Sequence, residues 1–107
     1  MPITTTFELP GRRVVASRGA CFGLVVRSMG MVKGIAAALQ TMRQGEVSQY
    51  TNLLEDSRRH AIDRMVDNAR LLGANAIIGM RFDSSEIGSS LTEIVAYGTA
   101  VVVEPDG

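Results

Sequence analysis

The stretch LLGANAIIGMRFDSSEIG, residues 71–88, decides the fold because it joins a helix to a sheet. Its two leucines continue an apolar pattern of helical spacing, and Gly73 follows them, where glycine can take the left-handed conformation that ends a helix. The run NAIIGMRFD, residues 75–83, is typical of a buried strand, and SSEIGSS, residues 84–90, has the serines and glycines of a hairpin loop. We therefore predict a helix, a glycine stop, a strand and a turn. A structural role accounts for the stretch better than a cation site at Asp83 and its neighbours, because no calcium-loop spacing is present.

Upstream of this stretch, the sequence predicts a long helix over residues 48–72. Its apolar residues recur at helical spacing and form one face: Tyr50, Leu54, Ala61, Met65, Ala69 and Leu72. A first helix is predicted over residues 29–43, with Ser28 as its N-cap and Gly45 just beyond its end.

Strands are predicted on both sides of the helical region. RRVVASRGACFGLVV, residues 12–26, is rich in β-branched residues, and its glycines Gly19 and Gly23 predict a bend or bulge. TEIVAYGTAVVVE, residues 92–104, is the last strand, and TTTF near the start is a possible short one. The order strand, helix, helix, strand, strand predicts one α+β domain over residues 1–107, an antiparallel sheet with two helices packed on one face. The other face and the edges of the sheet then remain to be covered, for example by a second copy.

Composition and charge exclude several classes of function. The 107 residues are 46% hydrophobic, and eleven basic residues balance eleven acidic ones, so nucleic acid and anionic membranes are not expected as partners. One cysteine cannot form an internal disulfide, and the N-terminus shows no secretory pattern. The longest apolar runs are too short to cross a bilayer, so we expect a cytoplasmic protein.

The run ARLLGANAIIGMRFDSSEIG, residues 69–88, followed by EIVAYGTAVVV, residues 93–103, resembles the YbjQ-like family, whose common label is heavy-metal binding. The resemblance covers almost the whole chain. It implies an α+β subunit that assembles into a closed homo-oligomeric ring, a homopentamer, in which short extra strands join neighbours. The matching segment here is Thr4, Thr5 and Thr6, and structural or interface roles are also expected for Arg58, Gly73, Gly79 and Gly98.

The metal label can be compared with the ligands that the chain offers. Soft metals prefer several thiolates and imidazoles, and this chain has one cysteine and one histidine. Cys21 is expected to be a buried apolar residue unless a ring gathers sulfurs near its axis. His60 lies opposite the apolar stripe, on the same side as Asp56, Asp63 and Asp67. This set could hold a hard divalent ion weakly, but a solvated face compensated by Arg59, Arg64 and Arg70 is the simpler interpretation. The cofactor stays unknown, with a divalent or heavy-metal ion as the candidate.

Basic residues at two further places in the sequence have predicted roles, one in binding an anion and one in an ion pair. Arg27, Ser28 and Lys33 gather at the start of the predicted first helix, where free backbone N–H groups favour a phosphate or carboxylate. Arg58 falls within the apolar stripe, so we expect its charge to extend past the core or to pair with a carboxylate, such as Glu86 or Glu93.

Three functional hypotheses follow. The first is a non-enzymatic ring that binds a small ligand or ion between subunits, with itself as its partner. The second is a scaffold ring without a ligand. The third, an enzyme, has little support, because the single histidine and cysteine lack a catalytic signature and no phosphate or dinucleotide loop is present.

Overall fold

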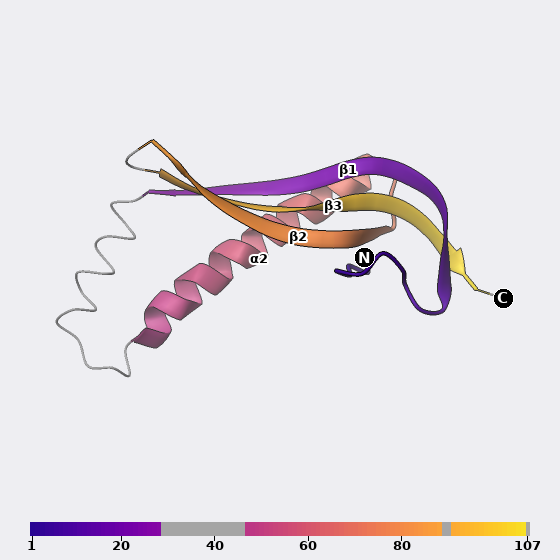
Figure 1. Ribbon diagram of the computed structural model, residues 1–107, viewed down its shortest axis with the longest axis horizontal. Coiled ribbons are helices and arrows are strands. Elements are labelled where there is room, and N and C mark those ends of the chain that lie inside the picture. Colours follow the sequence, from indigo (N-terminus) through magenta and orange to yellow (C-terminus); the bar gives the residue numbers. More distant parts are fainter. Residues whose placement is uncertain (29–46, 89–90, 107) are drawn as a thin grey trace.

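The computed structural model describes the chain in three stretches, residues 1–28, 47–88 and 91–106. These stretches contain one helix and three strands, in the order β1 (Arg12–Ser28), α2 (Val47–Leu71), β2 (Ala76–Ile87) and β3 (Leu91–Pro105). The strands form one antiparallel sheet in the order β1-β3-β2, and α2 lies across one face of it (Figure 1). The predicted α+β class is confirmed. The predicted first helix, residues 29–43, lies outside the described residues.

The helix ends as the opening stretch predicts. Gly73 has a φ of 84°, its N–H donates to the carbonyl of Arg70 at 2.9 Å, and the N–H of Ala74 donates to the carbonyl of Ala69 at 3.1 Å. This pair of bonds is the Schellman motif, and both Ala69 and Ala74 belong to the buried core. The joint therefore turns the chain from α2 back onto the sheet.

The core lies between α2 and the sheet, mainly under β1 and β3. Ala61, Met65 and Ala69 are fully buried, so the middle of the predicted stripe is confirmed. Leu54 and Leu72 depart from the prediction, because they are 39% and 43% exposed. Leu54 lies in the first half of α2 and Leu72 follows its last residue, so both lie beyond its closely packed middle.

The two glycines of β1 have different roles. Gly19 has a φ of 90° and lies at a register shift between Ser17 and Gly19, so the predicted bulge is confirmed there. Gly23 lies in regular register instead. A Cβ at this position would overlap the backbone of α2 at the carbonyl oxygen of Ala61 and the nitrogen of Met65. Gly23 therefore permits the close approach of helix and strand.

The predicted loop over residues 84–90 is wrong at its first half. Ser84 pairs with Ile94 and Ile87 with Leu91, so β2 continues to Ile87. The polar residues are tolerated because this end of the hairpin is exposed. Successive side chains of a strand point to opposite faces, so the oxygens of Asp83 through Glu86 do not converge as a cation loop would require.

The N-terminal segment covers part of the outer edge of β2. The N–H of Thr4 donates to the carbonyl of Ile77 at 3.0 Å, and the N–H of Gly79 donates to the carbonyl of Thr6 at 2.8 Å. Arg81 Nη1 also donates to the carbonyl of Thr5 at 2.7 Å. The threonine segment, expected from the resemblance to join a neighbouring subunit, thus pairs with its own chain.

Gly79 and Gly98 have a packing role that the sequence only partly indicated. Gly79 has a φ of 62°, and a Cβ there would lie 2.8 Å from the ring of Phe7. A Cβ at Gly98 would lie 2.8 Å from Ile77 Cγ2 and 3.0 Å from the carbonyl oxygen of Ile78. Both glycines let neighbouring groups approach the sheet closely.

Candidate functional site

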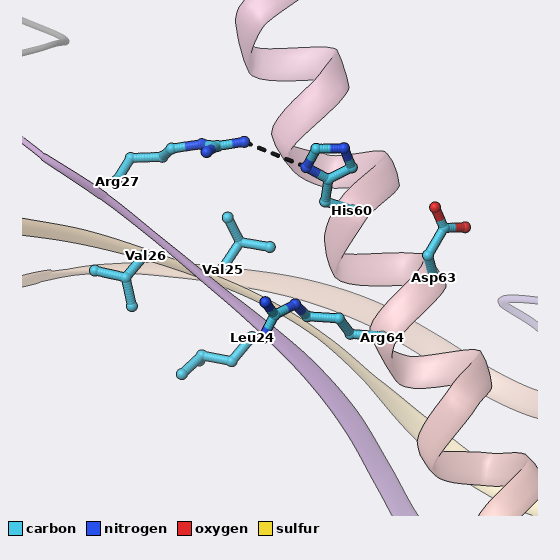
Figure 2. A pocket seen from close by; sticks show the side chains of 7 residues that line it. All are labelled: Leu24, Val25, Val26, Arg27, His60, Asp63 and Arg64. Carbon is cyan, nitrogen blue, oxygen red and sulfur yellow. Dashed lines mark hydrogen bonds between the residues drawn. The ribbon is translucent and has the colours of Figure 1, made fainter.

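A hollow of about 540 Å³ lies between the end of β1 and the exposed side of α2. Its lining combines apolar residues and one arginine of β1 with polar and charged residues of α2: Leu24, Val25, Val26, Arg27, His60, Asp63 and Arg64 (Figure 2). This size is within the range of small-molecule sites. The hollow is therefore a candidate binding site, and it brings together residues that were named from the sequence, Arg27, His60 and Asp63.

Arg27 is held in place from the helix side. Its Nε donates to Ser57 Oγ at 3.0 Å, and Ser57 is only 1% exposed. Its Nη2 lies 3.4 Å from His60 Nδ1. Because a guanidinium only donates, Nδ1 is the acceptor in this contact. The other ring nitrogen, Nε2, faces Asp56 Oδ2 at 3.9 Å.

Arg64 differs from its neighbours on α2. Arg59 approaches Glu55 at 3.9 Å and Arg70 approaches Asp67 at 3.8 Å, but Arg64 forms no ion pair with the residues that the structure describes. Its side chain instead extends toward β1 beside Leu24, while the carboxylate of Asp63 points away from the strand (Figure 2). Arg64 therefore forms no close pair with the carboxylates that it was expected to compensate.

Cys21 is a core residue, as predicted. It is 2% exposed, and its Sγ donates to the carbonyl of Gly98 at 3.6 Å. Burial away from water raises the pKa of this thiol, with hydrogen bonds at the Cys21 and Gly98 backbone opposing the shift. A soft metal requires the thiolate, so burial disfavours a metal role. Because α2 covers Cys21, its sulfur is also closed to a neighbouring copy.

We predict a pH dependence of stability from this thiol. A raised pKa means that the folded state keeps the proton more strongly than the unfolded state does, so the stabilisation is fully present below the ordinary value of 9.0 and falls as pH rises through the folded pKa. The free energy of unfolding of the wild type should therefore fall more steeply above pH 9 than that of Cys21→Ala. Urea titrations from pH 7 to 10 measure the difference, and a constant offset between the two proteins would contradict it.

The proposed carboxylate and histidine ligands do not form a metal centre within one chain. Among the described residues, no three His, Cys, Asp or Glu side chains are placed to hold one metal ion. His60 is near Asp56, Asp67 is near Arg70, and Asp63 lines the hollow. The four residues share one side of α2 as the spacing predicts, but their side chains have separate neighbours.

The other basic candidates have surroundings that differ from those predicted from the sequence. Arg58 lies with its guanidinium carbon 4.9 Å from the ring centroid of Phe82, a cation–π contact, and pairs with neither Glu86 nor Glu93. Of the predicted anion site, Arg27 lines the hollow and Ser28 is the last residue of β1. Lys33 lies outside the described residues.

Sequence reasoning missed three residues of this region. Ser57 falls within the apolar stripe of α2, and a buried hydroxyl at that place requires a polar partner, which is Arg27. Asn68 Nδ2 donates to the carbonyl of Phe22 at 2.7 Å and so occupies one acceptor at the edge of β1. Arg64 had no distinguishing signal, because its role depends on how closely α2 approaches β1.

On the side of the sheet away from α2, apolar residues of β1 and β3 form a patch, which we call the bare face: Phe22, Leu24, Val26, Val95 and Tyr97. Phe22 pairs with Tyr97 and Leu24 with Val95, so these side chains share one face. Phe22 is 57% exposed, and Val26 and Tyr97 are each 43% exposed. Farther along the sheet, Leu9 packs against Val101 and Val103 in a second small core. One end of this face is therefore covered and the other is open.

Comparisons with known proteins identify relatives of the whole chain. The family model YbjQ_1, described as "Putative heavy-metal-binding", matches residues 1–104. A UPF0145 protein from Bradyrhizobium sp. strain ORS 278 is 53% identical over 98% of this chain and 95% of its own, and one from Methanoregula boonei is 48% identical over 97% and 87%.

A solved structure has a similar fold. It is a protein of unknown function from Pediococcus pentosaceus, described as a member of the DUF74 family, with a TM-score of 0.61 at 17% identity over 97% of this chain and 98% of that one. Within the described residues, no helix is long and apolar enough to cross a membrane.

Proposed function

This chain belongs to the YbjQ_1 family, and from that premise we propose that it is a non-enzymatic, homo-oligomeric protein that binds a small ligand beside its subunit contacts. The observation that carries the proposal is the bare face, which leaves large apolar side chains in water on one chain. A contiguous exposed patch of this kind is typical of an interaction site.

A second copy of the chain is the occupant that the molecule favours. The bare face continues the small core formed by Leu9, Val101 and Val103, so covering it extends a packed region that already exists. A head-to-tail contact between copies forms a closed ring when the rotation from one copy to the next divides a full turn evenly. The family resemblance favours five copies in a closed ring, and we take a cytoplasmic location as part of the same proposal.

Ligand binding is supported by the position of the hollow. Leu24 and Val26 belong both to the bare face and to the lining of the hollow, so a copy seated on the bare face lies at its rim. A heavy-metal ligand is less well supported, because Cys21 is buried as a thiol and His60 lies on the exposed side of α2. Because Cys21 is buried in the core and His60 lies on the exposed side of α2, a cysteine–histidine catalytic pair is also poorly supported.

We predict that Phe22→Asp disrupts the assembly. Phe22 is exposed in the single chain, so the substitution leaves the fold intact, but it places a charge in the centre of an apolar contact. The dissociation constant between subunits should rise roughly a hundredfold or more. Native mass spectrometry of the untagged wild type and variant measures the change.

The matched control is Leu71→Asp, which places the same charge at a residue 85% exposed at the end of α2. It should assemble as the wild type does. A wild type that is monomeric at micromolar concentration would contradict the proposed assembly. If the wild type is oligomeric and Phe22→Asp does not change its subunit count, the contact between subunits lies on another surface.

A further inference from the structure

We propose that the hollow between β1 and α2 is a binding site for a small multivalent anion, held by the guanidinium groups of Arg27 and Arg64. This deepens the proposed function, on which it rests, by naming the class of ligand. The two arginines come from different elements, one from the end of β1 and one from the middle of α2, and line the same hollow (Figure 2).

The first argument is that Arg27 is fixed before any ligand arrives. Its Nε is occupied by the buried hydroxyl of Ser57, and its Nη2 lies beside His60 Nδ1. These contacts involve the inner edge of the guanidinium and leave Nη1 without a partner among the described residues. A side chain already held in one rotamer loses little entropy when it binds an anion.

The second argument is the charge balance of the hollow. Arg27 and Arg64 form no ion pair with any carboxylate of the described residues, although Asp63 lies next to Arg64 in the sequence and lines the same hollow. Figure 2 shows the Asp63 carboxylate directed away from β1. Two cations thus face the space between strand and helix, where an anion would be attracted to both.

The third argument is the apolar character of the strand side of the hollow. Val25 is the apolar side chain of β1 that faces α2 there and is only 8% exposed, while Leu24 and Val26 of the bare face line the hollow at the edge of β1. Low polarity beside the guanidinium groups strengthens their attraction for an anion. Guanidinium groups bind carboxylate and phosphate through paired hydrogen bonds, so the ligand class is a phosphate or a small polycarboxylate.

The test is isothermal titration calorimetry of the full chain with inorganic phosphate and, separately, with malonate, at low ionic strength and pH 7. We expect saturable binding of at least one of the two, with one site per chain. Arg64→Gln should raise the dissociation constant at least tenfold, which is roughly the effect of losing one pair of charge-assisted hydrogen bonds. Arg59→Gln, which removes an exposed arginine of the same helix that pairs with Glu55, should change it less than about twofold.

Asp63→Asn is expected to change the affinity for the anion in the opposite direction. Removing this negative charge from the lining should tighten binding, whereas a variant that merely disturbs the fold would weaken it. Circular dichroism confirms that each variant is folded. No saturable binding of either anion to the wild type, or equal affinity of the wild type and Arg64→Gln, would overturn the proposal.

Failure of this inference is separable from failure of the proposed function. An oligomer that binds neither anion refutes the anion site and leaves the assembly standing. Binding that persists in Phe22→Asp, alongside a wild type that proves monomeric, refutes the assembly and leaves the anion site standing.

Discussion

Gly23→Ala is expected to lower the free energy of unfolding by about 3 kcal/mol or more. The added Cβ would overlap the carbonyl oxygen of Ala61 and the nitrogen of Met65, which are backbone atoms in the middle of α2. Backbone atoms in a helix cannot move singly, so the whole helix must shift from β1 and lose contacts along its buried face. Urea denaturation, at one fixed protein concentration because association adds to apparent stability, measures the loss.

The matched control is the other glycine of the same strand. Gly19 has a φ of 90° but no atom within 4 Å of a Cβ placed there, so Gly19→Ala strains the backbone without a clash. Its cost should be about 1–2 kcal/mol. A loss at Gly23 no greater than the loss at Gly19 would contradict the close approach of α2 to β1.

The difference between these glycines shows how far the sequence could predict the fold. Both interrupt a run of β-branched residues, and local pattern predicts a bulge at each. Only Gly19 has one, because the space at Gly23 is set by a helix that begins 24 residues later along the chain, at Val47. The stop at Gly73 was predictable because its cause is local: a helix end, a left-handed residue and two backbone bonds.

The candidate site was less predictable for the same reason. Arg27 was identified as an anion ligand from its neighbours in the sequence, but its partners Ser57 and His60 lie 30 and 33 residues away. The pairing depends on which turn of α2 crosses the end of β1. Arg58 shows the opposite error: the sequence indicated a carboxylate partner, and the sheet instead presents the ring of Phe82. Charge alone did not distinguish these surroundings.

Met65→Ala is the second substitution with a large expected effect, a loss of about 2–5 kcal/mol in the free energy of unfolding. Met65 is fully buried between α2 and the sheet, and truncation leaves a cavity that the close contact at Gly23 prevents the helix from filling. Leu71→Ala is the control, because Leu71 is 85% exposed on the same helix and should change stability by less than about 0.5 kcal/mol. Equal losses in the two variants would mean that the middle of α2 is not the centre of the core. The position of the hollow beside β1, which depends on this part of the helix, would then have no support.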